Sequence, residues 1–182
     1  MKIAAILAEG FEETEFIAVT DLLRRASLDV LVVSSTGNLT VSGAHDFKIV
    51  ADSLWDDVEF EDVDCIFLPG GMPGVTNLQS NKKVVETVQR FAEQDKFICA
   101  ICAAPLVLDD AGILDGKKFT CYPSTVSQIK SGEYCDKAVV ADGKIITGKG
   151  VGTALDLGLA MVAAFCSEEK SESLKKAIVY GV

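Results

Sequence analysis

Short apolar runs alternate with helical patterns along this chain, and that alternation limits the folds open to it. Residues 2–8, 28–33, 65–68 and 97–101 are nearly continuous runs of apolar side chains. Runs of this kind are typical of strands that are buried on both faces. The sequence therefore predicts an α/β fold with a mostly parallel sheet between two layers of helices.

The segments between these runs complete the pattern. Residues 13–25 carry apolar side chains at helical spacing between the first two strands, which makes a strand-helix-strand unit. The other elements are predicted as helices over 75–94, 104–111, 152–165 and 172–179, a hairpin over 138–147, a hairpin or edge strand over 43–50, and a solvated connection over 52–64. Ligands are expected at the carboxyl ends of the parallel strands.

Length and charge set the class of protein. The 182 residues, nearly half of them hydrophobic, fit a single domain over residues 1–182 with one continuous core. A net charge of −10 repels polyanions and anionic lipids, so neither nucleic acid nor a membrane is expected as a partner. No apolar run approaches the roughly 20 residues of a membrane span, and the first strand begins at once. We expect a cytoplasmic protein.

The cysteines are predicted to be reduced, and no metal site is expected. Four of the six lie in or beside apolar stretches, where a thiol packs as a small hydrophobe: Cys65, Cys99, Cys121 and Cys166. The chain has one histidine, His45, and one close pair of cysteines, which is too few ligands for structural zinc.

The run over 97–101 leads directly into a helix through Cys102. Pro105 suits the first turn of that helix, because the N–H that proline lacks would have no partner there. Ala103 and Ala104 are the small neighbours that a sharp strand-to-helix elbow needs. We predict that Cys102 is a nucleophile at this elbow, and that the N-terminus of the helix lowers its pKa below the usual value of about 8.5. The alternative is a core cysteine that ends a strand.

Cys99 and Cys102 form a C-x-x-C motif, which in another setting would indicate a dithiol oxidoreductase. Here Cys99 lies within the predicted strand. Residues three apart on a strand point to opposite faces, and their Cα atoms are about 10 Å apart, which exceeds the reach of a disulfide. A redox dithiol is therefore not expected.

Glu15 is an acidic residue on an apolar stripe. Its neighbours on the helix face are Val19 and Leu22, so its carboxyl should point inward near the carboxyl end of the first strand. The other acids of this turn are expected to face water. A carboxyl removed from water keeps its proton, which would make Glu15 a hydrogen-bond donor to the Cys102 thiolate. The alternative is a first-turn glutamate that reaches solvent.

A glycine-rich turn follows the strand at 65–68. The backbone N–H groups of Gly70 and Gly71, together with that of Ala103 at the elbow, could bind an oxyanion at the same edge of the sheet.

Together these segments resemble the ThiJ/PfpI superfamily, specifically its DJ-one branch, the Parkinsonism-associated deglycase family. The motifs that carry the resemblance are Glu12-Glu13-Thr14-Glu15, Leu68-Pro69-Gly70-Gly71, Ala100-Ile101-Cys102-Ala103-Ala104-Pro105 and Gly150-Val151-Gly152-Thr153. The resemblance implies a flavodoxin-like three-layer sandwich of the class I glutamine amidotransferase-like type, and a homodimer. It also implies a cysteine that oxidises to a sulfinate stabilised by the protonated glutamate.

The functions that the resemblance implies are oxidative-stress sensing, chaperone activity, and glyoxalase or deglycase activity without a cofactor. Small dicarbonyls such as methylglyoxal, or a peroxide, are the expected reactants. Tyr122 stands where some relatives carry a pocket histidine, and Val151 replaces a common proline. Arg25 and His45 match positions near the pocket and the dimer interface of relatives, so the three pocket candidates are Tyr122, Arg25 and His45.

The residues also bear on three other classes of protein. A peptidase or amidotransferase would need a histidine beside the nucleophile, where Ala103 stands. A flavin-binding module is suggested by Ser34–Thr40, but that loop follows the second strand and does not open a helix. A sensor or holdase without turnover remains open, because the sequence does not separate it from a glyoxalase.

Overall fold

The computed structural model describes residues 1–181 and is built on a central sheet. Within these residues the sheet has seven strands in the order β10-β11-β7-β6-β1-β2-β5. All neighbouring strands are parallel except β10 and β11, which form the predicted hairpin. The strands are β1 (Lys2–Leu7), β2 (Asp29–Ser34), β5 (Ser53–Leu54), β6 (Cys65–Leu68), β7 (Phe97–Ile101), β10 (Val139–Asp142) and β11 (Ile145–Gly148).

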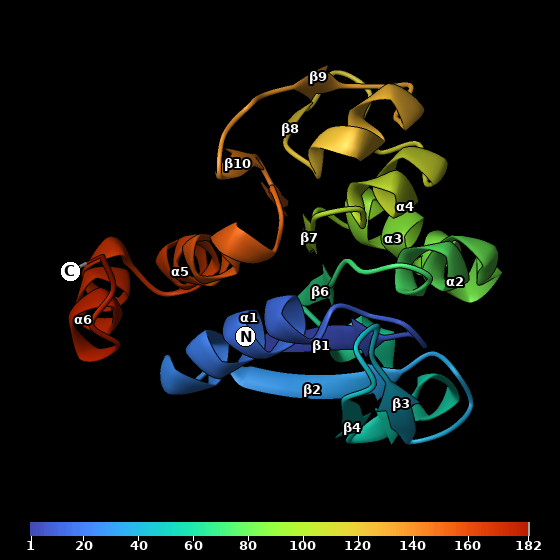
Figure 1. The fold of residues 1–182 in the computed structure, drawn as a ribbon, viewed down its shortest axis with the longest axis horizontal. Coiled ribbons are helices and arrows are strands. Elements are labelled where there is room, and N and C mark those ends of the chain that lie inside the picture. Colours follow the sequence, from blue (N-terminus) through green and yellow to red (C-terminus); the bar gives the residue numbers. More distant parts are fainter. Residues whose placement is uncertain (182) are drawn as a thin grey trace.

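Helices cover both faces of the sheet, which confirms the predicted three-layer α/β sandwich. In Figure 1, α5 and α6 lie to the left of the strands and α2, α3 and α4 to the right. Successive residues of β1 alternate between two apolar clusters, Ala4 and Ile6 in one and Ile3 and Ala5 in the other. The helices are α1 (Glu13–Arg25), α2 (Gly74–Ser80), α3 (Lys82–Glu93), α4 (Pro105–Asp110), α5 (Ala154–Phe165) and α6 (Glu168–Ala177).

Smaller elements surround this framework. Residues 43–50 belong to a separate hairpin of β3 (Thr40–Ser42) and β4 (Lys48–Val50), and β8 (Lys118–Phe119) pairs with β9 (Glu133–Tyr134). The 3-10 helices are Trp55–Asp57, Phe60–Asp62, Pro123–Gln128 and Val151–Thr153. Among the described residues, no helix combines the length and hydropathy that a bilayer crossing requires.

The structure differs from the predicted elements in three places. The helix predicted over 75–94 is two helices, because Asn81 ends α2 and caps α3 by accepting the N–H of Lys83. The connection over 52–64 was wrongly predicted to be solvated, since it contains edge strand β5 and buries Phe60 and Val63. Helix α6 begins four residues earlier than predicted, where Ser167 supplies its N-cap.

The strand order brings separate loops together at one edge of the sheet. Strand β1 pairs with β2 on one side and with β6 on the other, so the chain segments that follow β1 and β6 diverge there. Such a point forms a crevice at the carboxyl ends of the strands, where ligands bind in open α/β sheets. Glu15, Gly70 and Cys102 follow three adjacent strands, β1, β6 and β7, at this edge.

Candidate active site

Cys102 occupies the predicted elbow between β7 and α4. Its backbone has φ +63°, a left-handed conformation that is uncommon for a residue other than glycine. Hydrogen bonds hold it from both sides: its N–H donates to the carbonyl of Gly148 (3.0 Å), and its carbonyl accepts the N–H of Tyr122 (2.8 Å). The chain is therefore fixed in a strained turn whose side chain is only partly buried.

The carboxyl of Glu15 is fully buried beside Cys102, in the first turn of α1. Its Oε2 accepts the backbone N–H of Gly70 at 2.8 Å. Its Oε1 is buried and has no well-formed hydrogen bond within residues 1–181, while the Cys102 thiol lies close enough to interact with the carboxyl. The inward orientation predicted from the helix stripe is confirmed.

Two of the three predicted backbone donors face the sulfur. The N–H groups of Gly71 and Ala103 both act on the Cys102 thiol and favour its thiolate. The prediction for Gly70 is wrong, because its N–H is used by Glu15. Gly70 is required for close packing instead: an added Cβ would lie 2.6 Å from the Cβ of Cys102 and 2.6 Å from Oε2 of Glu15.

Glu15 and Cys102 titrate as a coupled pair. Burial raises the pKa of Glu15 to about 7, although the Cys102 thiol and the Gly70 N–H oppose this. Burial, followed by the negative charge of Glu15, raises the pKa of Cys102 to about 12. The Cys102 pKa of about 12 holds only while Glu15 is ionised. The two pKa values therefore describe the loss of the first and then of the second proton from the pair.

While Glu15 is ionised, the expectation that the helix N-terminus lowers the pKa of Cys102 is therefore wrong. The N–H groups of Ala103 and Gly71 do act in that direction, but burial and the ionised Glu15 carboxylate outweigh them. Between pH about 7 and about 12 the pair holds one proton and one negative charge.

Two further acids of this segment matter, although both were expected to face water. Glu13 is buried, and its carboxylate accepts the N–H of His45 at 2.7 Å and contacts His45 Nδ1 at 2.9 Å. Glu12 is the N-cap of α1, and its Oε2 accepts the N–H of Glu15. Glutamate is not among the residues preferred at an N-cap, so the local sequence carries little signal for this cap.

The structure places the three pocket candidates at different distances from the thiol. Tyr122 is joined to Cys102 through the backbone, and its ring is half-exposed beside Gly150. His45 contacts Glu13, which precedes Glu15 by two residues in α1. Arg25 lies ten residues along α1 from Glu15, about 15 Å of helix, and pairs with Asp21. The prediction that Arg25 lies in the pocket of its own chain is therefore wrong.

Glu12, Glu13 and His45 are the one group of possible metal donors found in the described chain, with donor atoms within 4.8 Å of one another. Their donors are already engaged: Glu12 with the N–H of Glu15, and Glu13 with His45. The N-terminus of α1 also disfavours a cation. We assign no metal ligands here.

The other five thiols are separate from this pair. The sulfur of Cys99 lies 3.8 Å from that of Cys65, and both residues are fully buried. Cys102 packs against the same apolar cluster as Cys99, so the argument that the two point to opposite faces is wrong. The strand ends at Ile101, and its alternation does not extend into the elbow.

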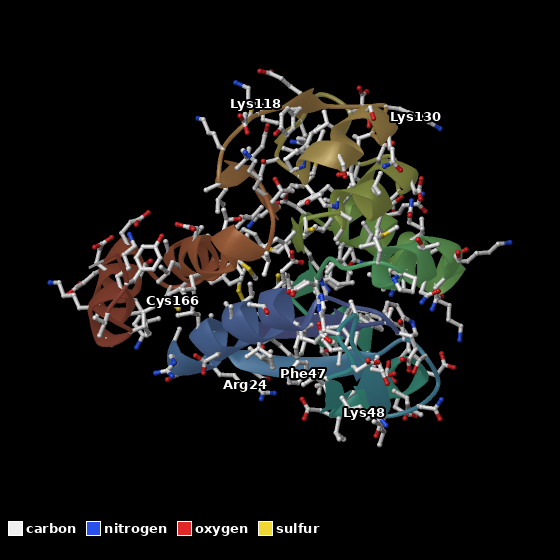
Figure 2. All side chains as sticks on the ribbon, in the orientation of Figure 1. Arg24, Phe47, Lys48, Lys118, Lys130 and Cys166 are labelled. Atoms are coloured by element: carbon white, nitrogen blue, oxygen red, sulfur yellow. The ribbon has the colours of Figure 1, made fainter. Side chains whose placement is uncertain are left out.

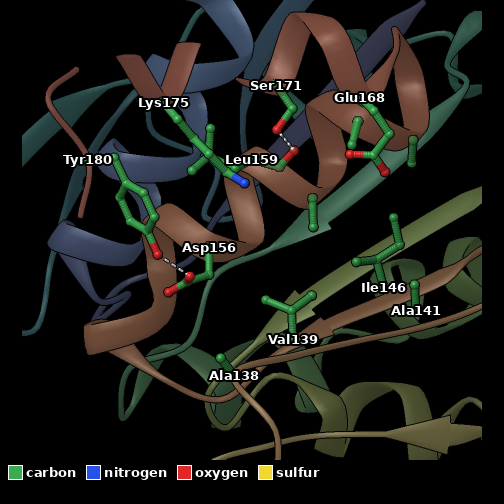
Figure 3. Close-up of a pocket in the computed structure, with 13 residues that line it drawn as sticks. Ala138, Val139, Ala141, Ile146, Asp156, Leu159, Glu168, Ser171, Lys175 and Tyr180 are labelled. Atoms are coloured by element: carbon green, nitrogen blue, oxygen red, sulfur yellow. Dashed lines mark hydrogen bonds between the residues drawn. The ribbon is translucent and has the colours of Figure 1, made fainter. Parts of the chain in front are cut away.

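A cavity of about 530 Å³ lies between α5, α6 and the β10–β11 hairpin (Figure 3). Apolar side chains such as Val139 and Leu159 form its wall, and Tyr180 donates a hydrogen bond to Asp156 at its rim. The described residues that line it include none of the predicted site residues, so the chemistry is not assigned to this cavity.

The sequence and the fold are similar to those of known proteins. The sequence profile of the DJ-1/PfpI family matches residues 1–164. Protein DJ-1 homolog B of Arabidopsis thaliana is 39% identical over 172 residues, 94% of this chain and 39% of the plant protein. The chain spans less than half the length of the two plant homologues that it matches.

A relative of similar length is the glutathione-independent glyoxalase DJR-1.2 of Caenorhabditis elegans. It is 35% identical over 170 residues, which cover 92% of this chain and 90% of the nematode protein. Among solved structures, oxidized DJ-1 of Toxoplasma gondii superposes with a TM-score of 0.95 at 30% identity, covering 100% of this chain and 99% of that one.

The contact between His45 and Glu13 predicts a pH-dependent contribution to stability. The hydrogen bond with Glu13 raises the pKa of His45 above its ordinary value. The contribution should be fully present below pH about 6.5 and should disappear as the pH rises through the folded-state pKa. Because His45 is the only histidine, one NMR titration measures its pKa directly. Glu13→Gln should lower that pKa, and an unchanged value would contradict the assignment.

Proposed function

The chain belongs to the DJ-1/PfpI family, and we propose that it is a cysteine-dependent stress-response protein. In this proposal Cys102 is the reactive group and Glu15 is its proton donor and acceptor. Cys102 senses oxidation, and the same thiolate catalyses glyoxalase or deglycase chemistry on methylglyoxal-type dicarbonyls without a cofactor. The glyoxalase named among the relatives supports the substrate class, and the oxidized structure of another relative supports the redox chemistry.

The observation that carries the proposal is the unequal support for the two anions of the buried pair. Two backbone N–H groups, those of Gly71 and Ala103, lie near the Cys102 sulfur and favour its thiolate. The Glu15 carboxylate has one, that of Gly70, and the charge of Glu12 disfavours it. These contacts favour the proton on Glu15 and the negative charge on sulfur when the pair holds one proton.

Oxidation follows from this arrangement. The thiolate attacks a peroxide oxygen, an S–O bond forms as the O–O bond breaks, and the departing oxygen takes a proton to leave as water. A second peroxide converts the sulfenate to a sulfinate in the same way. Protonated Glu15 then donates a hydrogen bond to a sulfinate oxygen, while Gly71 and Ala103 offer backbone N–H groups.

Glyoxalase chemistry uses the same two groups. The thiolate adds to the aldehyde carbon of methylglyoxal, and Glu15 protonates the resulting oxyanion. The Glu15 carboxylate then removes the proton from that carbon, which gives an enediolate. Glu15 returns this proton to the neighbouring carbon, and the hydroxyl proton moves from the oxygen of the first carbon to the oxygen of the second, which gives a thioester. Water hydrolyses the thioester to lactate and restores Cys102. Because Tyr122 replaces the histidine of some relatives, Glu15 performs these proton transfers alone.

A hydrolase of the peptidase or amidotransferase type has less support. It needs a histidine beside the nucleophile. The single histidine, His45, contacts Glu13, and Ala103 follows Cys102. A holdase or sensor without turnover remains the alternative to the glyoxalase.

A homodimer is part of the proposal. Large apolar side chains stay exposed on α1 and the β3–β4 hairpin, namely Ile17 (47%), Phe47 (68%) and Val50 (67%). Figure 2 shows Phe47 on the outer surface beside this hairpin. We infer that a second copy of the chain covers these side chains.

Purified protein should convert methylglyoxal to lactate, and Cys102→Ser should reduce that turnover at least about a hundredfold, because a serine hydroxyl, unlike a thiol, does not ionise near neutral pH. The fold should be retained. Cys99→Ser is the matched control, since it changes a buried thiol outside the site and should lower stability rather than turnover. Lactate formation by the purified wild type decides between enzyme and sensor. Substantial turnover by Cys102→Ser would remove Cys102 from the mechanism.

Graded peroxide should add two oxygens to Cys102 before comparable change at any other cysteine. Thiolate character and access control this reaction, and the fully buried thiols have neither. Peptide mass spectrometry of the oxidised protein measures the order. Earlier oxidation of Cys121 or Cys135, or recovery of Cys102 mainly in a disulfide, would contradict the sensor proposal.

Glu15→Leu should raise the pH at which the Cys102 thiolate forms. In the wild type the thiolate should appear with the first step of the pair, near pH 7. Without the acid, a partly buried thiol should ionise at or above its ordinary pKa of about 8.5. Thiolate absorbance against pH measures both proteins, with Cys102→Ser as the blank. A wild-type midpoint near 12 that falls in Glu15→Leu would place the charge on Glu15 and refute the assignment.

A further inference from the structure

Three hydrogen bonds join Glu12, Glu15 and Gly70 in a closed ring at the crevice. The N–H of Glu12 donates to the carbonyl of Gly70 (2.8 Å), and the N–H of Gly70 donates to Oε2 of Glu15 (2.8 Å). The N–H of Glu15 donates to Oε2 of Glu12 (2.5 Å), which completes the ring. Each residue both donates and accepts, so the position of the Glu15 carboxyl depends on Glu12.

The ring leaves one oxygen of Glu15 for the thiol. Oε2 is held by Gly70, whereas Oε1 is buried without a well-formed bond in the part of the chain that the structure describes. Gly71 packs its Cα against the backbone of Glu12, where an added Cβ would lie 2.3 Å from the Glu12 nitrogen. The same glycine presents its N–H to Cys102. Glu12 therefore touches both the acid and the backbone cradle of the sulfur.

Glu12 also carries the charge that acts on this acid. Three groups face the Glu15 carboxyl: the Cys102 thiol from the elbow, the Gly70 N–H from the turn after β6, and the Glu12 carboxylate from the N-cap of α1. The carboxylate of Glu12 disfavours a second negative charge on Glu15, whereas the charge that acts on Cys102 is that of Glu15 itself. Glu12 thus acts on one member of the pair.

We infer that Glu12 is a positioning residue for the chemistry at Cys102, which holds the Glu15 carboxyl in place and biases the shared proton towards Glu15. The inference rests on the proposed function, because it concerns the same pair. A glutamate at an N-cap usually stabilises a helix by a few hydrogen bonds alone. Here the cap has a second consequence, since its negative charge disfavours ionisation of the Glu15 carboxyl that it holds.

Glu12→Gln tests the charge while keeping an amide oxygen that can accept the Glu15 N–H. The rate of Cys102 alkylation by iodoacetamide is measured against pH. With Glu15 protonated, thiolate formation does not depend on Glu12, so the acid limbs of the two profiles should superimpose. In Glu12→Gln the midpoint of the rate profile should move to lower pH by about half to one unit. The plateau rate should fall about three- to tenfold, because Glu15 then takes more of the negative charge.

Two further variants separate this role from a structural one. Glu12→Asp keeps the charge and a good N-cap, so it should restore the wild-type midpoint and most of the plateau. Glu9→Gln removes one charge from the same segment, where the Glu9 side chain binds the N–H of Ser42, and should leave the profile unchanged. An equal shift in Glu9→Gln, or no shift in Glu12→Gln, would overturn the inference.

A second measurement separates this inference from the proposed function. The carboxyl carbon of Glu15 is titrated by NMR in Cys102→Ser protein, with and without Glu12→Gln. A lower Glu15 pKa in the double variant supports the role of Glu12 even if Cys102 proves unreactive. A reactive Cys102 together with an unchanged Glu15 titration would refute the role of Glu12 and leave the proposed function intact.

Discussion

The site depends on a carboxyl group that the fold buries beside a thiol. Removing a charged carboxylate from water costs several kcal/mol unless hydrogen bonds replace the water. Glu15 has one backbone donor, that of Gly70, so a negative charge on the pair is costly and both protons are held until the pH reaches about 7. Cys102 faces the same low-dielectric surroundings, and a second anion next to the first is unfavourable up to about pH 12. Burial thus couples the two side chains, which together hold a single proton between pH about 7 and about 12.

The parallel sheet supplies this pair through its connectivity. Glu15, Gly70 and Cys102 lie in segments that are more than thirty residues apart, yet each follows a strand that ends at the same edge. Hydrophobic burial on both faces fixes the register of β1, β6 and β7, because a slip of one residue would exchange the two apolar clusters. The precision of the site therefore comes from the core, while the loops carry the chemistry.

The sequence predicted the parts of this site that local periodicity determines. Glu15 lies on an apolar stripe, and Cys102 lies where a buried strand meets a proline-started helix, so both placements could be read from spacing. The burial of Glu13 could not, because it depends on a hairpin thirty residues away. The interruption at Asn81 was hidden by apolar spacing that continues through it. The rise of the Cys102 pKa beside an ionised Glu15 could not be read from the helix N-terminus, because it comes from burial and from a charge on a distant segment.

The same pair cannot serve both proposed reactions at once. A glyoxalase cycle returns the thiolate and the protonated Glu15 to their starting state, whereas oxidation to sulfinate removes the nucleophile. In the sulfinate the sulfur oxygens would occupy the place of a substrate oxyanion and take the hydrogen bond of Glu15. In the proposed chemistry, the features that would make Cys102 a good nucleophile, the nearby N–H groups of Gly71 and Ala103 and its partial exposure, would also make it oxidisable. Within the proposed chemistry, peroxide therefore acts as an inactivator of dicarbonyl turnover, and sensing is the loss of that turnover through the one residue on which it depends.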